Sequence, residues 1–244
     1  MVPPLEALRV RRRWGRHVAV DDLDLAVAAG EVVAVVGLNG AGKTTLMRLL
    51  LGMVAPDAGQ TRIRGVDVRD ASATAWADVG HMVDAACAWP QLTVRQNLEA
   101  AARLHGVPPA LRAGAVDDAI ERLVLGEWAD RPMARLSSGN RQRLGLACAL
   151  VHRPGVIVLD EPSRALDPAG VVAVRRLLRA EAGRGAAILV SSHHLDEIAR
   201  VADRILVLHR GRWVGRLDPA GEDLERRFFD LVRVADGVER AVDA

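Results

Sequence analysis

Short apolar runs recur along the chain and alternate with longer segments of helical periodicity. The run at 31–36 is rich in β-branched residues and has the length expected of a parallel strand buried on both faces. Turn residues bound several other runs, for example at 56–59, which reads Pro-Asp-Ala-Gly. The pattern predicts strands at 18–27, 31–36, 60–66, 79–83, 156–159, 186–190 and 205–208.

Helical periodicity fills much of the chain between these strands. The segment 93–125 is predicted as two helices, because Gly106-Val-Pro-Pro interrupts its pattern. Further helices are predicted at 44–52, 139–152 and 168–182. Helices that separate the strands of the second half favour a parallel core sheet, with the middle helices as an inserted subdomain.

Length and composition limit the class of protein. With 244 residues, the chain has room for one large domain, or for one domain with a subdomain. Its longest apolar stretch, about 144–151, is far shorter than the ~20 residues of a membrane span, and its first residues lack the hydrophobic core of a signal peptide. Cys87 and Cys148 form no disulfide framework, so we expect packing thiols in a reducing cytosol. A net charge of +2 from nearly balanced signs is no nucleic-acid footprint.

Lys43 is the only lysine among the 33 lysine and arginine residues of the chain. It stands in the segment 37–44, Gly-Leu-Asn-Gly-Ala-Gly-Lys-Thr, which matches the phosphate-binding loop G-x-x-x-x-G-K-[ST]. An ammonium is a compact charge that fits between β- and γ-phosphate oxygens, whereas the planar guanidinium does not. A strand, a glycine-rich turn and a helix start let backbone N–H groups converge on a polyphosphate. The predicted cradle consists of Gly37, Asn39, Gly40, Ala41, Gly42, Lys43, Thr44 and Thr45.

Two adjacent acids follow the apolar strand at 156–159. Asp160 stands at the carboxyl end of that strand, where a carboxylate beside a phosphate loop can hold Mg²⁺ or its bound waters. The hydroxyl of Thr44 is the second expected Mg²⁺ ligand. Glu161 comes next and is expected to point toward the γ-phosphate, where it polarises the attacking water. Two acids after four apolar residues would be unfavourable with no cation nearby, so the pattern favours a magnesium nucleotide site.

Together with other segments, these residues resemble the nucleotide-binding ATPase subunits of ABC transporters. The segment 136–143, Leu-Ser-Ser-Gly-Asn-Arg-Gln-Arg, is similar to the family's signature, usually Leu-Ser-Gly-Gly-Gln, and the basic helix after it. The segment 164–167 is similar to the loop along the family's dimer interface, and 191–193 to its strand-end switch histidine. Trp14 stands where the family has an aromatic ring that stacks on adenine. The resemblance spans nearly the whole chain, from about residue 9 to residue 232.

The resemblance implies an α/β fold with a P-loop NTPase core of the RecA-like type. In that fold the core sheet is mainly parallel, and it carries a small antiparallel β subdomain and an inserted helical subdomain. We therefore expect an ABC-type ATPase domain at 5–235 with the helical subdomain at about 86–152. A C-terminal tail is expected at 236–244.

The resemblance also implies a catalytic site shared between two subunits. Ser137, Ser138 and Gly139, at a helix N-terminus, form an anion site that in the family meets the γ-phosphate bound by the other subunit. His193 can donate a hydrogen bond to that phosphate while Glu161 orients water. The expected catalytic residues are Glu161, His193 and Lys43, and the expected metal ligands are Thr44 and Asp160.

The largest departure from the family pattern is Asp84. It stands where the family usually has a glutamine that contacts Mg²⁺ and links the core to the helical subdomain. An acid here, with the segments 85–90 and 92–94, is similar to a branch of bacterial exporter ATPases for drugs, antibiotics and lantibiotic-like peptides. The tail at 222–232 also resembles the short C-terminal helix of that branch. As a shorter, charged side chain, Asp84 is expected to reach Mg²⁺ only through a water and to repel phosphate oxygens.

These expectations describe an ATP-hydrolysing subunit of an export-type ABC transporter that uses ATP and Mg²⁺. It is expected to pair with a second copy or another ATPase subunit, on separate membrane-spanning permease subunits at the cytoplasmic face of the cell membrane. An importer ATPase and a soluble ABC ATPase acting on DNA or ribosomes are the alternatives. The chain has no long coiled-coil insertion and no dominant basic patch, so no nucleic-acid partner is expected. A GTP-binding switch is excluded because its Asn-Lys-x-Asp pattern needs a second lysine.

Overall fold

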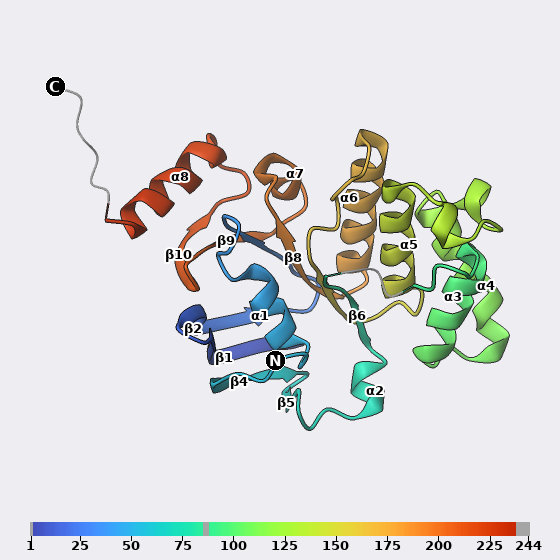
Figure 1. Ribbon diagram of the computed structural model, residues 1–244, viewed down its shortest axis with the longest axis horizontal. Coiled ribbons are helices and arrows are strands. Elements are labelled where there is room, and N and C mark those ends of the chain that lie inside the picture. The colour runs from blue at the N-terminus through green and yellow to red at the C-terminus, as the bar shows by residue number, and fades with distance from the viewer. Residues whose placement is uncertain (1, 85–87, 238–244) are drawn as a thin grey trace.

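The computed structural model describes residues 2–84 and 88–237, and within them two sheets are flanked by helices (Figure 1). The larger sheet has six strands in the order β10-β9-β3-β8-β7-β6. Every neighbouring pair in it is parallel except β10 with β9. Its strands are β3 (Val32–Val36), β6 (Val79–Met82), β7 (Val156–Leu159), β8 (Ala187–Ser192), β9 (Arg204–His209) and β10 (Arg212–Leu217). The expectation of a mainly parallel core sheet is confirmed.

The second sheet is antiparallel and has the order β2-β1-β4-β5. Its strands are β1 (Leu5–Trp14), β2 (His17–Val27), β4 (Ala58–Ile63) and β5 (Val66–Asp67). The sequence pattern missed β1, because exposed arginines and register shifts interrupt the alternation of its buried positions. The strand predicted at 60–66 is divided, since Arg64 and Gly65 both adopt positive φ and form a turn.

The helices follow the predicted segments within a few residues, with two short helices in addition. They are α1 (Lys43–Leu50), α2 (Ala73–Trp76), α3 (Val94–Leu104), α4 (Pro109–Arg122), α5 (Ser138–Leu150), α6 (Pro168–Gly183), α7 (Leu195–Ala199) and α8 (Leu224–Ala235). Two 3₁₀ turns cover Gly126–Trp128 and Met133–Arg135. The pattern missed α2 and α7, which are too short to show a helical period. Within 2–84 and 88–237, no helix is long and apolar enough to cross a bilayer.

The parallel sheet separates two hydrophobic cores. Along β3, Val33 and Val35 face a core formed with α1 and the antiparallel sheet. Val32, Ala34 and Val36 face the opposite core, which includes residues of α5 and α6. Because successive side chains of a strand point to opposite faces, a continuously apolar strand is what a sheet covered on both faces requires.

The helices α3, α4 and α5 lie together at the side of the molecule away from the antiparallel sheet (Figure 1). They occupy the segment expected to form the helical subdomain, and Cys148 is buried within α5. Cys87, part of the segment leading into these helices, and the tail after residue 237 lie outside the described residues.

Candidate active site

The glycine-rich loop connects β3 to α1, and close approaches require two of its glycines. A Cβ on Gly42 would lie 2.2 Å from the carbonyl oxygen of Ala19, and a Cβ on Gly37 would lie 2.3 Å from that of Leu208. Gly42 also caps α1 with a φ of 110°, a conformation that side chains rarely adopt. The loop is therefore packed tightly against β2 and β9, directly before the start of α1.

Lys43 lies inside this loop with only 8% of its surface exposed. Its Nζ donates hydrogen bonds to the carbonyl oxygens of Gly37 at 2.6 Å and Leu38 at 3.3 Å. Burial lowers the pKa of Lys43, while the charges of Glu161 and Asp160 act in the opposite direction. The ammonium therefore sits between loop carbonyls and two carboxylates. Thr44 and Thr45 follow it in the first turn of α1.

Asp160 links the loop to the two neighbouring strand ends. Its Oδ2 accepts a hydrogen bond of 2.6 Å from the Thr44 hydroxyl, and its Oδ1 accepts one from the Ser191 hydroxyl. The same Ser191 oxygen accepts the backbone N–H of Glu161 at 2.9 Å. Ser191 is fully buried at the end of β8. Its part in orienting both acids was not anticipated from the sequence, where it was only one of two serines before the switch histidine.

Glu161 and His193 are brought together although 32 positions separate them. His193 Nδ1 lies 2.5 Å from Glu161 Oε2. Glu161 has a φ of 51°, an uncommon conformation for a residue with a side chain. The backbone oxygen of Glu161 accepts a hydrogen bond of 3.1 Å from Gln142 Nε2, and that bond ties the acid to α5. The role of Gln142 was also missed by the sequence reasoning.

The signature segment forms the start of α5. Ser137 is the N-cap, and its hydroxyl oxygen accepts the backbone N–H of Asn140 at 3.2 Å. Gly139 approaches the neighbouring loop so closely that a Cβ would lie 2.9 Å from the carbonyl oxygen of Ala165. Within this subunit, Ser138 lines the same cavity as Asp160.

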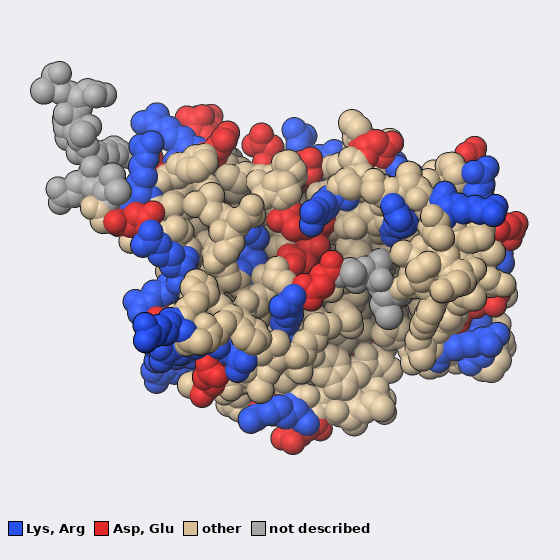
Figure 2. Space-filling model, viewed as in Figure 1, with Lys and Arg blue, Asp and Glu red and all other residues tan. Residues whose placement is uncertain are grey.

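Two cavities adjoin these residues. One, of about 490 Å³, is lined by Thr44, Met82, Asp84, Met133, Ser138, Arg141, Gln142, Asp160, Glu161, Arg164 and Ala165. The other, of about 1060 Å³, extends from the loop residues Gly37 and Asn39 past His193 to Phe228 and Phe229 of α8. Figure 2 shows acidic side chains gathered down the middle of one face of the molecule. A site so rich in carboxylates needs a cation beside any phosphate.

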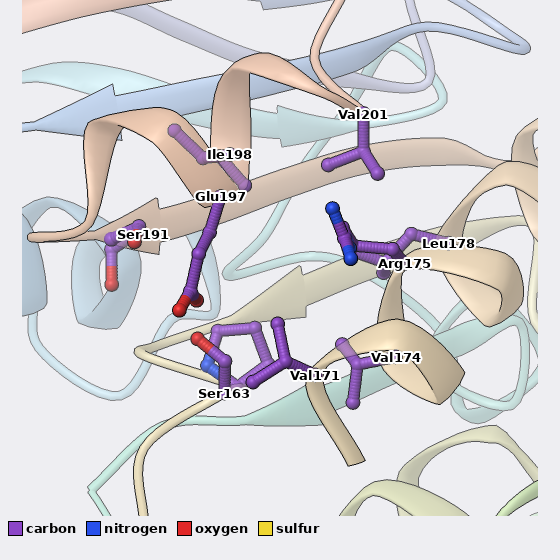
Figure 3. A pocket seen from close by; sticks show the side chains of 11 residues that line it. Ser163, Val171, Val174, Arg175, Leu178, Ser191, Glu197, Ile198 and Val201 are labelled. Carbon is purple, nitrogen blue, oxygen red and sulfur yellow. The ribbon is translucent and has the colours of Figure 1, made fainter. Parts of the chain in front are cut away.

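A much smaller cavity is lined in part by Ser191 and Ser192, the two residues before His193 (Figure 3). Its free volume is about 20 Å³, enough for about one water, so it is a packing gap and not a ligand site. Val171, Val174 and Leu178 of α6 line it opposite Ile198 and Val201. It lies between α6 and α7, the short helix that follows His193.

Trp14 and Asp84 each contact an arginine in this structure. Trp14 is 45% exposed at the tip of the β1–β2 hairpin, and the guanidinium of Arg12 lies 4.3 Å from its ring centroid. The carboxylate of Asp84 forms an ion pair with Arg48 of α1. Arg48 was not anticipated from the sequence, because nothing along the chain indicates its partner 36 positions away.

Comparison with known proteins identifies the family. Residues 20–164 match a family model described as ABC transporter. The chain belongs to the ABC transporter family. It carries the ATP-binding part of such transporters and is an ATPase.

Similar proteins support the same assignment over most of the chain. It is 37% identical to the Nod factor export ATP-binding protein I of Paraburkholderia xenovorans over 230 residues. That alignment covers 94% of this chain and 76% of the other protein. It is 38% identical to a daunorubicin resistance ATP-binding protein of Streptomyces coeruleorubidus over 201 residues. That alignment covers 82% of this chain and 64% of the other protein. The solved structure of an ATP-binding subunit of an ABC transporter superimposes with a TM-score of 0.81 at 28% identity. That superposition covers 93% of this chain and 94% of the other, so the expected P-loop NTPase fold is confirmed.

Proposed function

We propose that this ABC ATPase powers export. The observation that carries the ATPase part of the proposal is a continuous set of polar contacts from the phosphate loop to the candidate base: Thr44 to Asp160, Asp160 to Ser191, and Ser191 to Glu161. The export part rests on the similar proteins. Two similar proteins are named for Nod factor export and daunorubicin resistance. Those names favour export over import, and they favour an amphipathic substrate such as a drug or antibiotic.

The loop residues bind the phosphates of ATP, and Trp14 stacks on the adenine. The chain's own groups fit Mg²⁺, because the Thr44 hydroxyl and the Asp160 carboxylate present two oxygen atoms 2.6 Å apart beside the loop. When bound, Mg²⁺ neutralises charge on the phosphate oxygens. Lys43 exchanges its loop carbonyl partners for β- and γ-phosphate oxygens, which carry the negative charge that the carbonyl oxygens lack.

Glu161 is the group that orients and polarises the attacking water. Both backbone polar groups of Glu161 are held: its N–H donates to the Ser191 hydroxyl oxygen, and its carbonyl oxygen accepts from Gln142 Nε2. A carboxylate whose backbone is fixed in this way can act with little reorganisation. His193, now paired with that carboxylate, supplies an imidazole N–H to the γ-phosphate.

The catalytic site becomes complete in a pair of ATPase subunits. Ser137, Ser138 and Gly139 of one subunit, at the positive end of α5, face the γ-phosphate held by the other. The domain that takes part spans 5–235, with the helical subdomain at about 86–152. The pair docks on separate membrane-spanning permease subunits at the cytoplasmic face of the cell membrane, and ATP-driven closing of the pair moves the permease between two states.

The deciding experiment uses the variant Glu161→Gln. Loss of the charge stops hydrolysis but leaves the phosphate-binding groups in place, so the variant should accumulate as an ATP-bound dimer. Size-exclusion chromatography with and without Mg-ATP measures this. Glu225→Gln is the matched control, because it removes the same charge from the wall of the neighbouring cavity. A Glu161→Gln variant that stays monomeric at high concentration and saturating ATP contradicts the shared site.

A further inference from the structure

Asp84 lies beside the candidate active site, and one arginine holds both of its carboxylate oxygens. It follows β6 with a φ of 70° and lines the same cavity as Thr44 and Asp160. Arg48 Nε donates to Asp84 Oδ2 at 2.9 Å, and Arg48 Nη2 donates to Oδ1 at 2.5 Å. This two-point contact uses the planar fork that distinguishes arginine from lysine.

The helix α1 places Arg48 for this contact. Arg48 comes four residues after Thr44, so the two side chains lie on one face of α1. The hydrogen bond with Asp84 raises the pKa of Arg48, and the charge of Asp160 adds to that effect. The guanidinium therefore interacts with the acid at the end of β6 and also with the candidate magnesium ligand.

The charge of Asp84 matters because two other acids already face the nucleotide site. Without a counter-charge, Asp84 would be a third carboxylate beside Asp160 and Glu161, all lining one cavity. Each further negative charge repels a polyphosphate. The side chains of Arg48 and Asp84 are 36% and 46% exposed, so their pairing adds little to folding stability. Its effect should therefore appear in nucleotide binding.

We propose that Arg48 is a positioning residue of the nucleotide site. It holds Asp84 against α1 and cancels its charge, so that Asp84 adds no further net negative charge beside Asp160 and Glu161. A neutral glutamine at position 84 would not need this counter-charge, whereas an aspartate does. The inference rests on the proposed function, because it takes the cavity lined by Asp160 and Glu161 as the nucleotide site.

Calorimetric titration of the whole chain with ADP tests this inference, with EDTA in one series and Mg²⁺ in the other. With EDTA, Arg48→Gln should weaken ADP binding about fivefold, because the freed Asp84 faces the diphosphate. Mg²⁺ should reduce this loss, since the cation offsets the freed carboxylate. Arg69→Gln is the matched control: Arg69 makes the same two-point contact with Asp67, at 2.9 and 2.7 Å, on the antiparallel sheet side.

The charge at position 84 decides between positioning and a direct role of the arginine. Arg48→Gln combined with Asp84→Asn should bind metal-free ADP within about twofold of the wild type, because the pair is then neutral again and the charge that Arg48 cancels is gone. A double variant that binds metal-free ADP as weakly as Arg48→Gln overturns the inference. So does an Arg48→Gln variant whose ADP affinity equals that of Arg69→Gln. Melting temperatures of all variants verify that each is folded.

Asp84→Asn alone provides a test that does not depend on Arg48→Gln being folded. It leaves Arg48 uncompensated near the phosphates, so metal-free ADP should bind more tightly than to the wild type, and weaker binding contradicts the inference. A wild-type chain that binds no ADP overturns the proposed function together with this inference. If the wild type binds ADP but the Arg48 and Asp84 variants do not show the expected changes in affinity, this inference alone is overturned.

Discussion

His193 Nδ1 lies 2.5 Å from Glu161 Oε2, so the switch histidine and the candidate base are already in contact with each other. A neutral imidazole has a single N–H. If Nδ1 donates that proton to Glu161, Nε2 is left as an acceptor and cannot donate to a phosphate. His193 must therefore release Glu161, or become doubly protonated, before it can donate a hydrogen bond to the γ-phosphate.

Replacing this histidine should impair hydrolysis more than binding. His193→Gln removes the contact with Glu161, so phosphate release should fall by about 100-fold while ATP affinity changes little. Phosphate release and calorimetric titration measure the two effects separately. His194→Gln is the matched control, since its ring lies beside that of His193 with centroids 3.9 Å apart. Equal loss of hydrolysis in both variants would show that His193 has no special role.

Lys43→Arg should lose most ATP binding although it keeps the positive charge. The Lys43 ammonium is buried among loop carbonyls at 2.6 and 3.3 Å, and the larger guanidinium fork does not fit this space. Calorimetry with ATP measures the loss, and the exchange of the exposed Arg9 for lysine is the reverse control. Near-normal affinity of Lys43→Arg would contradict the assignment of this loop as the phosphate cradle.

Three histidines should make the stability of the chain depend on pH. The rings of His105 and His152 stack with centroids 3.7 Å apart, and burial lowers the pKa of both and of His81. The pKa of His152 falls to about 4, through burial first and then the charge of His105, while Asp78 acts in the opposite direction. The unfolded chain therefore binds protons before the folded chain does, and stability present at pH 7 is lost as the pH falls from about 6.5 to about 4.

Chemical denaturation at pH 7 and pH 4.5 measures this effect. His152 alone should account for a loss on the order of 3 kcal/mol in the free energy of unfolding over the whole range. His152→Gln should flatten the pH dependence, whereas the control His17→Gln, at an exposed position, should leave it unchanged. An unchanged slope in His152→Gln would show that other groups cause the acid sensitivity.

Glu181 should be a strong stability determinant of α6. It is fully buried and forms ion pairs with Arg122 of α4 and Arg184. Glu181→Gln removes the buried charge that Arg184 and Arg122 share and leaves Arg122 its longer pair with Asp118 at 3.5 Å, which should lower the free energy of unfolding by about 3 kcal/mol. Denaturant titration measures this change in the free energy of unfolding. The control Asp117→Asn breaks the exposed pair with Arg95 and should cost less than about 1 kcal/mol; an equal cost would contradict a special role of burial.

Local sequence determined the elements that carry the chemistry. The buried strand at 32–36, the loop with Lys43 and the start of α1 were predicted from residues that are neighbours in the chain. The acids after β7 were found for the same reason: four apolar residues followed by Asp160 and Glu161 is a local signal. Hydrophobic periodicity depends on the local geometry of a helix or strand, so it can be read without knowledge of the fold.

The tertiary structure alone decided which side chains meet. Arg48 and Asp84 are 36 positions apart, and Ser191 and Asp160 are 31 apart, yet each pair is joined by a hydrogen bond. Neither contact has a local signal, because each depends on the order of the strands in the sheet and on where α1 lies against it. The arginine-rich β1 was hidden for the same physical reason: its pairing with β2 and β4, and not its own composition, makes it a strand.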